Sequence, residues 1–188
     1  MEVREVVVDS ERLYVGVTGI RAERRLSPLL EILGELEEKY GAAVAIIKPA
    51  IALSARRLLI ACEQAVRRYY EGRAIAKKLS IEILLNIAAT RQIRDALEVA
   101  AAEPADDSAA LALVAKGESE LRALLDEILE VAGGSVDEEM LAPRETAVEE
   151  LLEIYRVSEE ELEVTYASSL LEALEKVLIS RTAMLYVE

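Results

Sequence analysis

Histidine is absent from this sequence of 188 residues, and cysteine occurs only once, at Cys62. A chain without histidine lacks the commonest general base and transition-metal ligand, and it cannot form a Ser–His or Cys–His nucleophile pair. One cysteine allows neither an intramolecular disulfide nor a thiolate cluster for zinc. Cys62 lies on the apolar face of a predicted helix, so we expect a buried structural thiol there. The composition therefore argues against most kinds of catalytic centre.

Long apolar runs and targeting signals are also missing. No stretch approaches the roughly 18 uninterrupted apolar residues of a membrane-spanning helix. Residues 1–9 lack the ordered basic, apolar and small-residue regions of a signal peptide. We therefore expect a cytoplasmic protein without a membrane partner. Asparagine occurs once and glutamine twice, beside abundant Glu and Arg, which is a bias common in proteins of thermophiles.

Glycine and carboxylate patterns form no recognisable catalytic motif. We expect Gly16 and Gly19 to loosen the end of the second predicted strand, but a phosphate-binding loop would need a further glycine and a Lys-Ser/Thr pair. Acidic pairs and runs fall in loops and in first turns of helices, where carboxylates complement the helix dipole. They are Asp106-Asp107, Glu138-Glu139 and Glu159–Glu161. We therefore predict a protein without catalytic residues, metal or cofactor.

What the chain does contain predicts one domain, residues 1–188, of the α+β class. The composition is 53% hydrophobic and 31% charged, as in globular proteins. Four runs of strand type occur: Val3–Val8 and Leu13–Val17, joined by a loop of about four residues, then Ala43–Ile47 and Leu111–Ala115. Their order among helical segments predicts a small mixed sheet of about four strands covered by helices.

Capping residues mark several helix boundaries. Ser27 and Pro28 begin a helix that Gly41 ends, and Ser54 begins a long helix that reaches Gly72. Later helices are predicted at Glu118–Ala132, Arg144–Tyr155 and Ala167–Ser180, and a capping box is predicted at Ser158–Glu161. Ser135–Pro143 is predicted to be a loop. The segment Ala183–Val187 is predicted to be either a helical turn or an edge strand.

The net charge of −14 hides an asymmetry. Residues 1–102 contain 16 Lys and Arg against 14 Asp and Glu, whereas residues 103–188 contain 6 against 22. Between Arg56 and Arg94, nine basic residues stand against three acidic ones, a local net charge of +6. Polyanions respond to local potential as well as to total charge. The basic part can therefore hold RNA, while the acidic part repels RNA or meets a basic protein.

The segment Arg73–Leu97 is the centre of the basic part. Apolar spacing predicts one helix packed by Ile81, Leu84, Leu85 and Ala88, a break at Ala89-Thr90, and a second helix from Arg91 packed by Ile93, Ala96, Leu97 and Ala100. Periodicity alone predicts a buried helical corner. The basic side chains allow two interpretations: a solvated face of Arg–Glu pairs, or a polyanion contact in which Tyr69 or Tyr70 stacks on an unpaired base.

Two short blocks in this corner, Glu82–Leu84 and Arg91–Ile93, carry a family resemblance. With the Ala-rich helix before the basic segment, Gly117 and the ending Arg181–Leu185, they resemble the small accessory subunit of the KEOPS complex, the PRPK-binding protein (TPRKB) family, in its archaeal type. The family typically has Ser-Gly where this chain has Ala88-Ala89, and an aromatic residue is common where Asn86 stands. The glycine-free turn predicts a more ordinary helix break.

The resemblance implies a non-catalytic subunit of the complex that makes threonylcarbamoyladenosine (t6A) in tRNA. Such a subunit binds the complex's kinase/ATPase subunit and the single-stranded 3′ CCA end of tRNA. The predicted RNA-contacting residues are Arg73, Lys77, Lys78, Arg91, Gln92 and Arg94, with Gln92 either a base contact or a local helix cap. For the kinase we predict contacts on the last helix, at Leu174, Val177, Leu178 and Arg181.

Two other classes of function stay open at this point. The first is a protein–protein scaffold or kinase regulator without RNA contact, in which the basic residues form surface ion pairs. The second is a small-molecule enzyme. The apolar helices of the second half likewise have two interpretations, since they either only pack the core or also present a face to a partner protein.

Overall fold

The computed structural model describes residues 1–142 and 148–187. The strands are β1 (Glu2–Val8), β2 (Glu11–Ala22), β3 (Ala43–Ile47), β4 (Ser108–Ala115) and β5 (Gly134–Val136). The helices are α1 (Ser27–Tyr40), α2 (Pro49–Ala52), α3 (Ala55–Tyr70), α4 (Leu79–Ala88), α5 (Ile93–Ala100), α6 (Glu118–Ala132), the 3-10 helix η1 (Glu138–Leu141), α7 (Val148–Tyr155), α8 (Glu159–Glu163) and α9 (Leu170–Met184).

The strands form one sheet in the order β1-β2-β4-β3, with β5 paired to β2. Every pairing among the described strands is antiparallel. The predicted α+β class is confirmed, but the expected mixed sheet of about four strands is a five-stranded antiparallel one. No helix in the described part of the chain combines the length and the apolarity that a membrane crossing needs.

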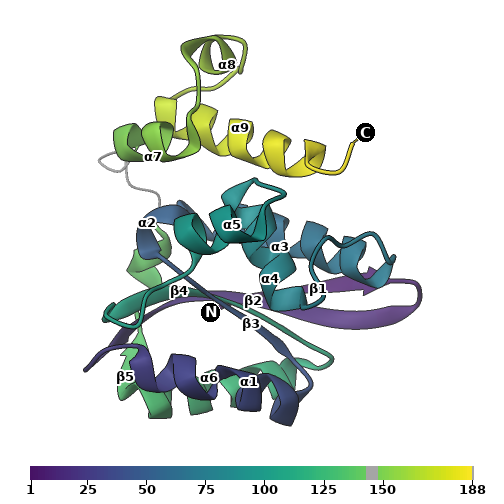
Figure 1. Cartoon of the computed structure of the whole chain (residues 1–188), viewed down its shortest axis with the longest axis vertical. Helices are drawn as coiled ribbons and strands as arrows, with labels where there is room; N and C mark the ends of the chain where they lie inside the picture. Colours follow the sequence, from purple (N-terminus) through teal and green to yellow (C-terminus); the bar gives the residue numbers. More distant parts are fainter. Residues whose placement is uncertain (143–147, 188) are drawn as a thin grey trace.

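Helices cover both faces of the sheet (Figure 1). α1 and α6 lie on one face, α3 and α4 on the other, and α7 to α9 form a further layer beyond α3 and α5. The central strand β4 serves both faces, because its leucines Leu111 and Leu113 pack toward α1 and α6, whereas Ala110 and Ala112 pack toward α3 and α4. A strand buried on both faces reads as a continuous apolar run, which is why the sequence revealed it.

The β1–β2 hairpin is tighter than predicted. Only Asp9 and Ser10 lie in the turn, with φ of 48° and 73°, and β2 continues past both of its glycines to Ala22. A Cβ at Gly16 would lie 2.6 Å from the Leu121 side chain, and one at Gly19 would lie 2.3 Å from the Asp137 carbonyl. These glycines therefore permit close approach of α6 and η1, and they do not loosen the end of the strand as expected.

Most capping predictions are confirmed. Gly41 ends α1 in the left-handed conformation, Ser54 accepts the Arg57 N–H at 3.1 Å, and Ser158 and Glu161 form a capping box. The predicted cap at Ser27 is wrong, because Leu26 occupies the N-cap position of α1 and makes no side-chain cap bond. Pro28 nevertheless lies in the first turn of α1, as predicted.

In the second half of the chain, the observed helices differ from the predicted ones mainly in where they begin and end. β5 and η1 occupy the segment predicted as a loop, and α2 was not predicted. Residues 144–147 of the predicted helix Arg144–Tyr155 lie outside the described residues, and the rest forms α7. α9 extends to Met184, so the helical alternative for the chain end is confirmed up to that residue.

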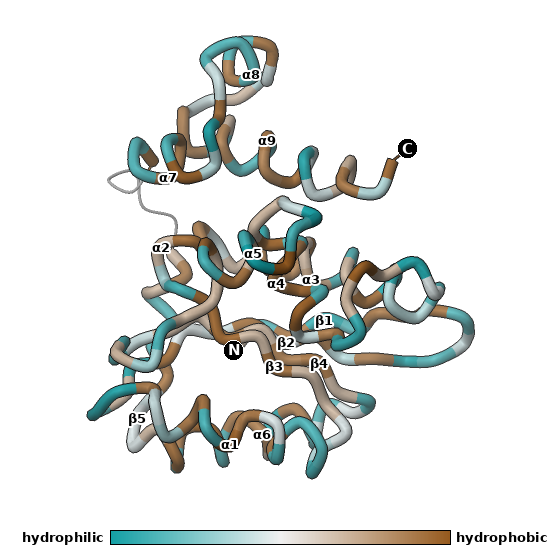
Figure 2. Tube along the Cα trace, viewed as in Figure 1, coloured by the Kyte–Doolittle hydropathy of each residue, from teal (hydrophilic) through white to brown (hydrophobic). Residues whose placement is uncertain are grey.

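The helical corner forms at α4 and α5, but its two helices are not equally buried. All of α4 except Ile81 is buried, and Figure 2 shows the hydrophobic colour along it. On α5 only Ala96 and Ala100 are buried, while Ile93 and Leu97 are 43% and 41% exposed. The expectation that both large residues pack the core is wrong, because α5 contacts α4 through its small side chains.

The turn after α4 keeps a glycine-like backbone without a glycine. Ala89 adopts φ of 50° and ψ of 43° at the C-cap, where its N–H and that of Thr90 close the helix. The prediction of an ordinary helix break is therefore wrong. A left-handed conformation costs an L-residue about 1–2 kcal/mol, and part of this is offset by the chain entropy that glycine would lose on folding.

Replacing Ala89 with glycine should therefore stabilise the protein by about 0.5–1 kcal/mol, which raises the melting temperature by about 2 °C. Ala88→Gly, one residue earlier and inside the helix, is the control and should destabilise by about 1 kcal/mol. Thermal unfolding followed by circular dichroism measures both. A lower melting temperature for Ala89→Gly would contradict the strain argument.

Candidate nucleic-acid interface

The six residues predicted to contact RNA are all exposed, but they lie in two groups at opposite ends of α4. Arg73, Lys77 and Lys78 lie on the segment 72–78 before α4, which we call the basic loop. The second group, Arg91, Gln92 and Arg94, follows α4; we call it the α5 group. A helix of ten residues is about 15 Å long. The structure thus replaces one predicted cluster by two cationic groups separated by a buried helix.

The cations differ in their pairing. Arg73 pairs with Glu71, and Lys78 Nζ lies 3.6 Å from Glu37. Lys77, Arg91 and Arg94 have no carboxylate partner in the part of the chain that the structure describes. The interpretation as surface ion pairs therefore describes the first two residues and leaves three cations free to meet phosphates.

Gln92 occupies the N-cap position of α5, as expected if it is a local helix cap rather than a base contact. Its side chain makes no cap hydrogen bond, and its backbone N–H instead donates to Thr90 Oγ1 at 3.2 Å. The turn is therefore fixed by Thr90, and the exposed side-chain amide of Gln92 has no hydrogen-bond partner among the described residues.

A cavity of 240 Å³ opens beside the basic loop. Its lining includes Lys77 and Lys78 together with Tyr69 and Tyr70, whose ring centres are 5.7 Å apart in an edge-to-face arrangement. Tyr69 donates its hydroxyl to the Lys77 carbonyl at 3.0 Å, which ties the loop to α3. Burial raises the pKa of Tyr70, so this phenol stays neutral. Ammonium groups and aromatic rings in one place suit a phosphate and an unpaired base.

Glu82 lies beneath the basic loop and is fully buried. Its Oε2 accepts the backbone N–H groups of Ile75 and Ala76 at 3.0 and 2.9 Å, and its Oε1 accepts the hydroxyl of Tyr186. Burial, and then the hydrogen bond to this carboxylate, raise the pKa of Tyr186. Sequence reasoning counted Glu82 only as an acid and as part of a family block. The sequence feature that could have indicated its buried role is the position of this acid in the middle of an otherwise apolar helix.

Three of the four predicted partner-binding residues of α9 are buried, and the fourth, Arg181, is only partly exposed. Leu174, Val177 and Leu178 are buried, where they pack toward the core rather than toward solvent. Arg181 is used internally, since its Nε donates to Glu161 at 2.9 Å and its Nη1 donates to the Tyr155 carbonyl at 2.5 Å. These residues join α9 to the rest of the fold.

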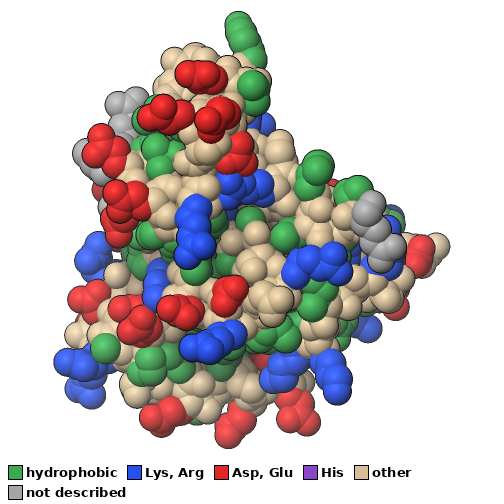
Figure 3. All heavy atoms as spheres, turned by 45° about the horizontal axis from the view of Figure 1, so that its top comes forward, with side chains coloured by type: hydrophobic (Ala, Val, Ile, Leu, Met, Phe, Trp, Pro, Cys, Tyr) green, Lys and Arg blue, Asp and Glu red, His purple; other side chains and the backbone are tan. Residues whose placement is uncertain are grey.

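Exposed apolar side chains lie elsewhere in this layer. Val164 and Tyr166, between α8 and α9, are 84% and 95% exposed, and Leu170 and Met184 lie at the two ends of α9. Figure 3 shows acidic side chains over the uppermost part of the molecule, and basic and acidic side chains mixed over the middle and lower parts.

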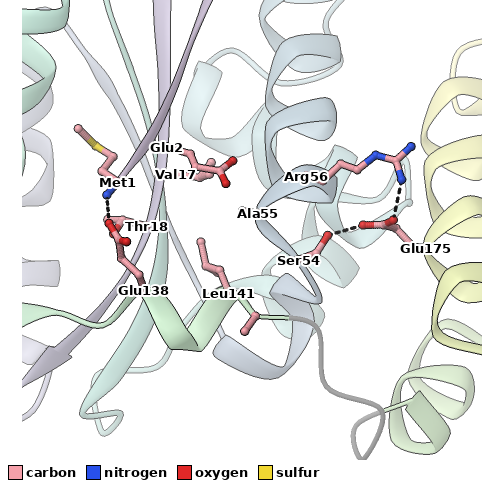
Figure 4. Close-up of a pocket in the computed structure, with 11 residues that line it drawn as sticks. Met1, Glu2, Val17, Thr18, Ser54, Ala55, Arg56, Glu138, Leu141 and Glu175 are labelled. Carbon is pink, nitrogen blue, oxygen red and sulfur yellow. Dashed lines mark hydrogen bonds and ion pairs between the residues drawn. The ribbon is translucent and has the colours of Figure 1, made fainter.

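A larger cavity, of 470 Å³, lies where α3 begins beside β2, η1 and α9 (Figure 4). The carboxylate of Glu175, from α9, accepts the Ser54 hydroxyl and pairs with Arg56 at 3.1 Å. Glu138 pairs with the terminal amine of Met1. Four of the charged groups that line this cavity, Met1, Arg56, Glu138 and Glu175, thus join α9 and η1 to neighbouring elements. The cavity shares no lining residue with the one beside the basic loop.

The lone thiol has the environment predicted for it. Cys62 is fully buried in the core, and burial raises its pKa to about 12, which keeps it as an unreactive thiol.

Among the described residues, no three acidic or cysteine side chains come together as they would around a metal ion. The described surface therefore offers cations, carboxylates and apolar side chains for binding.

Comparison with protein families supplies an independent finding. A model described as "Kinase binding protein CGI-121" matches residues 27–185, which includes the basic loop, the α5 group and α9. A comparison with curated proteins finds no match. Because the family match covers most of the chain, the protein belongs to the CGI-121 family of kinase-binding proteins.

Proposed function

We propose that this kinase-binding protein is a non-catalytic subunit of the KEOPS complex, which forms threonylcarbamoyladenosine in tRNA. In this role it binds the kinase/ATPase subunit of the complex and holds the 3′ CCA end of tRNA. The observation that carries the RNA part is the presence of three exposed cations flanking α4, Lys77, Arg91 and Arg94, that pair with no carboxylate of the described residues. The kinase part is supported by the family membership.

The arrangement favours a single strand over a duplex. Lys77 lines a cavity with Tyr69 and Tyr70, so a phosphate and a base could be held side by side there. The α5 group lies about 15 Å away along α4, which suits a backbone that continues past the cavity. Unpaired bases can stack and hydrogen-bond in such a site, whereas a duplex presents mainly its backbone.

Because Leu174 and Leu178 of α9 are buried, a contact with the kinase subunit would use other, exposed residues of the α7–α9 layer. A partner docked on α9 would meet exposed neighbours of the buried leucines, above all Val164, Tyr166 and Leu170. Apolar side chains surrounded by acids form a surface that suits a partner with an apolar centre and basic surroundings. The kinase site and the basic loop would then lie on different parts of the protein.

Removing the CCA end should lower the affinity of the isolated protein for tRNA by at least about tenfold, since each stacked base contributes about 1–3 kcal/mol. The measurement is a titration of labelled intact and CCA-trimmed tRNA over a salt series, in which log Kd for the intact tRNA should rise with log salt. Equal and negligible binding of both RNAs would leave the scaffold without RNA contact as the function. Steady turnover of a small substrate by the protein alone would contradict both.

A further inference from the structure

Four polar side chains from distant parts of the sequence meet below the basic loop. They are Arg68 of α3, Glu82 and Asn86 of α4, and Tyr186 after α9, and we call them the Glu82 cluster. Arg68 Nη1 donates to Asn86 Oδ1 at 2.8 Å, and Asn86 Nδ2 donates to Tyr186 Oη at 3.1 Å. The Arg68 guanidinium lies 3.7 Å from the centre of the Tyr186 ring. Each member therefore contacts at least two others or the loop.

Glu82 is the member whose side chain holds the middle of the basic loop, while the Arg68 carbonyl accepts the Arg73 N–H at its start, at 2.8 Å. Its Oε2 is the acceptor for the N–H groups of both Ile75 and Ala76, and its Oε1 is held by the Tyr186 hydroxyl. The loop has no helix or strand of its own to fix its backbone. Without the carboxylate, two N–H groups at the middle of the loop would lose their partners, and the Ala76 N–H is buried.

We propose that Glu82 and Tyr186 are positioning residues for RNA binding, which fix the shape of the basic loop without touching the RNA. This inference rests on the proposed tRNA contact of the loop. A loop that is ordered in the free protein loses less conformational entropy when it binds, so its cations bind phosphates more tightly. Tyr186 makes the end of the chain part of this site, although it lies more than a hundred residues from Lys77.

Two measurements on the full chain test the proposal. Hydrogen exchange at the Ile75 and Ala76 amides reports the loop, and titration with intact tRNA reports binding. Tyr186→Phe keeps the ring on Arg68 and removes only the hydroxyl; it should speed exchange at both amides and weaken tRNA binding about threefold. Glu82→Ala should weaken binding about tenfold or more.

Glu82→Gln provides the conservative rescue. Its amide oxygen can accept both N–H groups and its NH₂ group can donate to Tyr186, so slow exchange and an affinity within about twofold of the unaltered protein are expected. Tyr166→Phe, at a tyrosine that is 95% exposed, is the matched control and should change neither readout. If Glu82→Ala does not fold, Tyr186→Phe and Glu82→Gln still decide the question.

The outcomes separate this inference from the proposed function. Faster exchange in Tyr186→Phe with unchanged tRNA affinity would overturn the positioning role while leaving the tRNA contact in place. An unchanged exchange rate together with weaker binding would also overturn it. Absence of tRNA binding by the unaltered protein would overturn the proposed function, and this inference with it, whatever the exchange data show.

Discussion

Replacing Arg57 with alanine should lower the free energy of unfolding by about 3–4 kcal/mol, the largest stability effect that we expect for a single substitution. Arg57 is only 2% exposed, and its guanidinium donates to the Ile51 carbonyl at 2.7 Å, to the Ile87 carbonyl and to the Tyr155 hydroxyl at 2.8 Å. Urea unfolding followed by far-UV circular dichroism gives the change directly.

The size of this effect follows from what Arg57 joins. Ile51 and Ile87 lie in the last turns of α2 and α4, where carbonyls have no partner within the helix and carry the negative end of its dipole. One buried cation thus caps two helix ends and binds α7 through Tyr155. Truncation would leave the Ile51 carbonyl without this donor and open a cavity. The two losses are each worth about 1–3 kcal/mol.

Arg56 is the matched control because it precedes Arg57 on the same helix but is exposed. It pairs with Glu175 at the surface, so Arg56→Ala should cost no more than about 1 kcal/mol. Arg57→Met, which keeps most of the side-chain volume, should fall between the two variants. Equal stability of Arg56→Ala and Arg57→Ala would contradict the capping role.

Replacing Lys77, Arg91 and Arg94 together with alanine should weaken tRNA binding by about tenfold or more at moderate salt. These are the exposed cations near α4 that lack a carboxylate partner in the described structure, so their removal uncovers no acid and disturbs no ion pair. Each lost phosphate contact should also reduce the slope of log affinity against log salt by about 1. A titration at several salt concentrations measures both effects.

Two controls make this result specific. Arg24→Ala with Arg25→Ala removes exposed cations from the connection between β2 and α1, at the opposite end of β2 from the cavity beside the basic loop. That pair should leave binding nearly unchanged. Thermal unfolding of all variants shows whether the fold is intact. Equal losses in the triple variant and in the control pair would indicate attraction by overall charge rather than a site.

Local features of the sequence account for most of the helices and for the fold class. Apolar spacing and caps such as Ser54 and Gly41 act within a few residues, so the same signals operate in the sequence and in the fold. The charge asymmetry and the family blocks likewise depend only on the order of residues. They indicated the basic region and the kinase-binding family before any packing was known.

Burial and pairing could not be predicted in this way. Sequence counting treated Arg57 as one of nine basic residues and Glu82 as one of three acids, yet both are buried and hold the fold together. Ile93 and Leu97 had the spacing of core residues and are exposed, whereas the leucines expected to meet a partner are buried. In each case the outcome depends on which element packs against the residue from elsewhere in the chain.

The sequence by itself determined the elements, the uneven charge and the family, because these depend on neighbouring residues. The tertiary structure decided which cations are free, which acid lies under the basic loop and which face of α9 is covered. Those properties arise from contacts such as Arg57 to Tyr155 and Glu82 to Tyr186, which join residues 98 and 104 positions apart. No local pattern encodes them, since they exist only once the helices have packed.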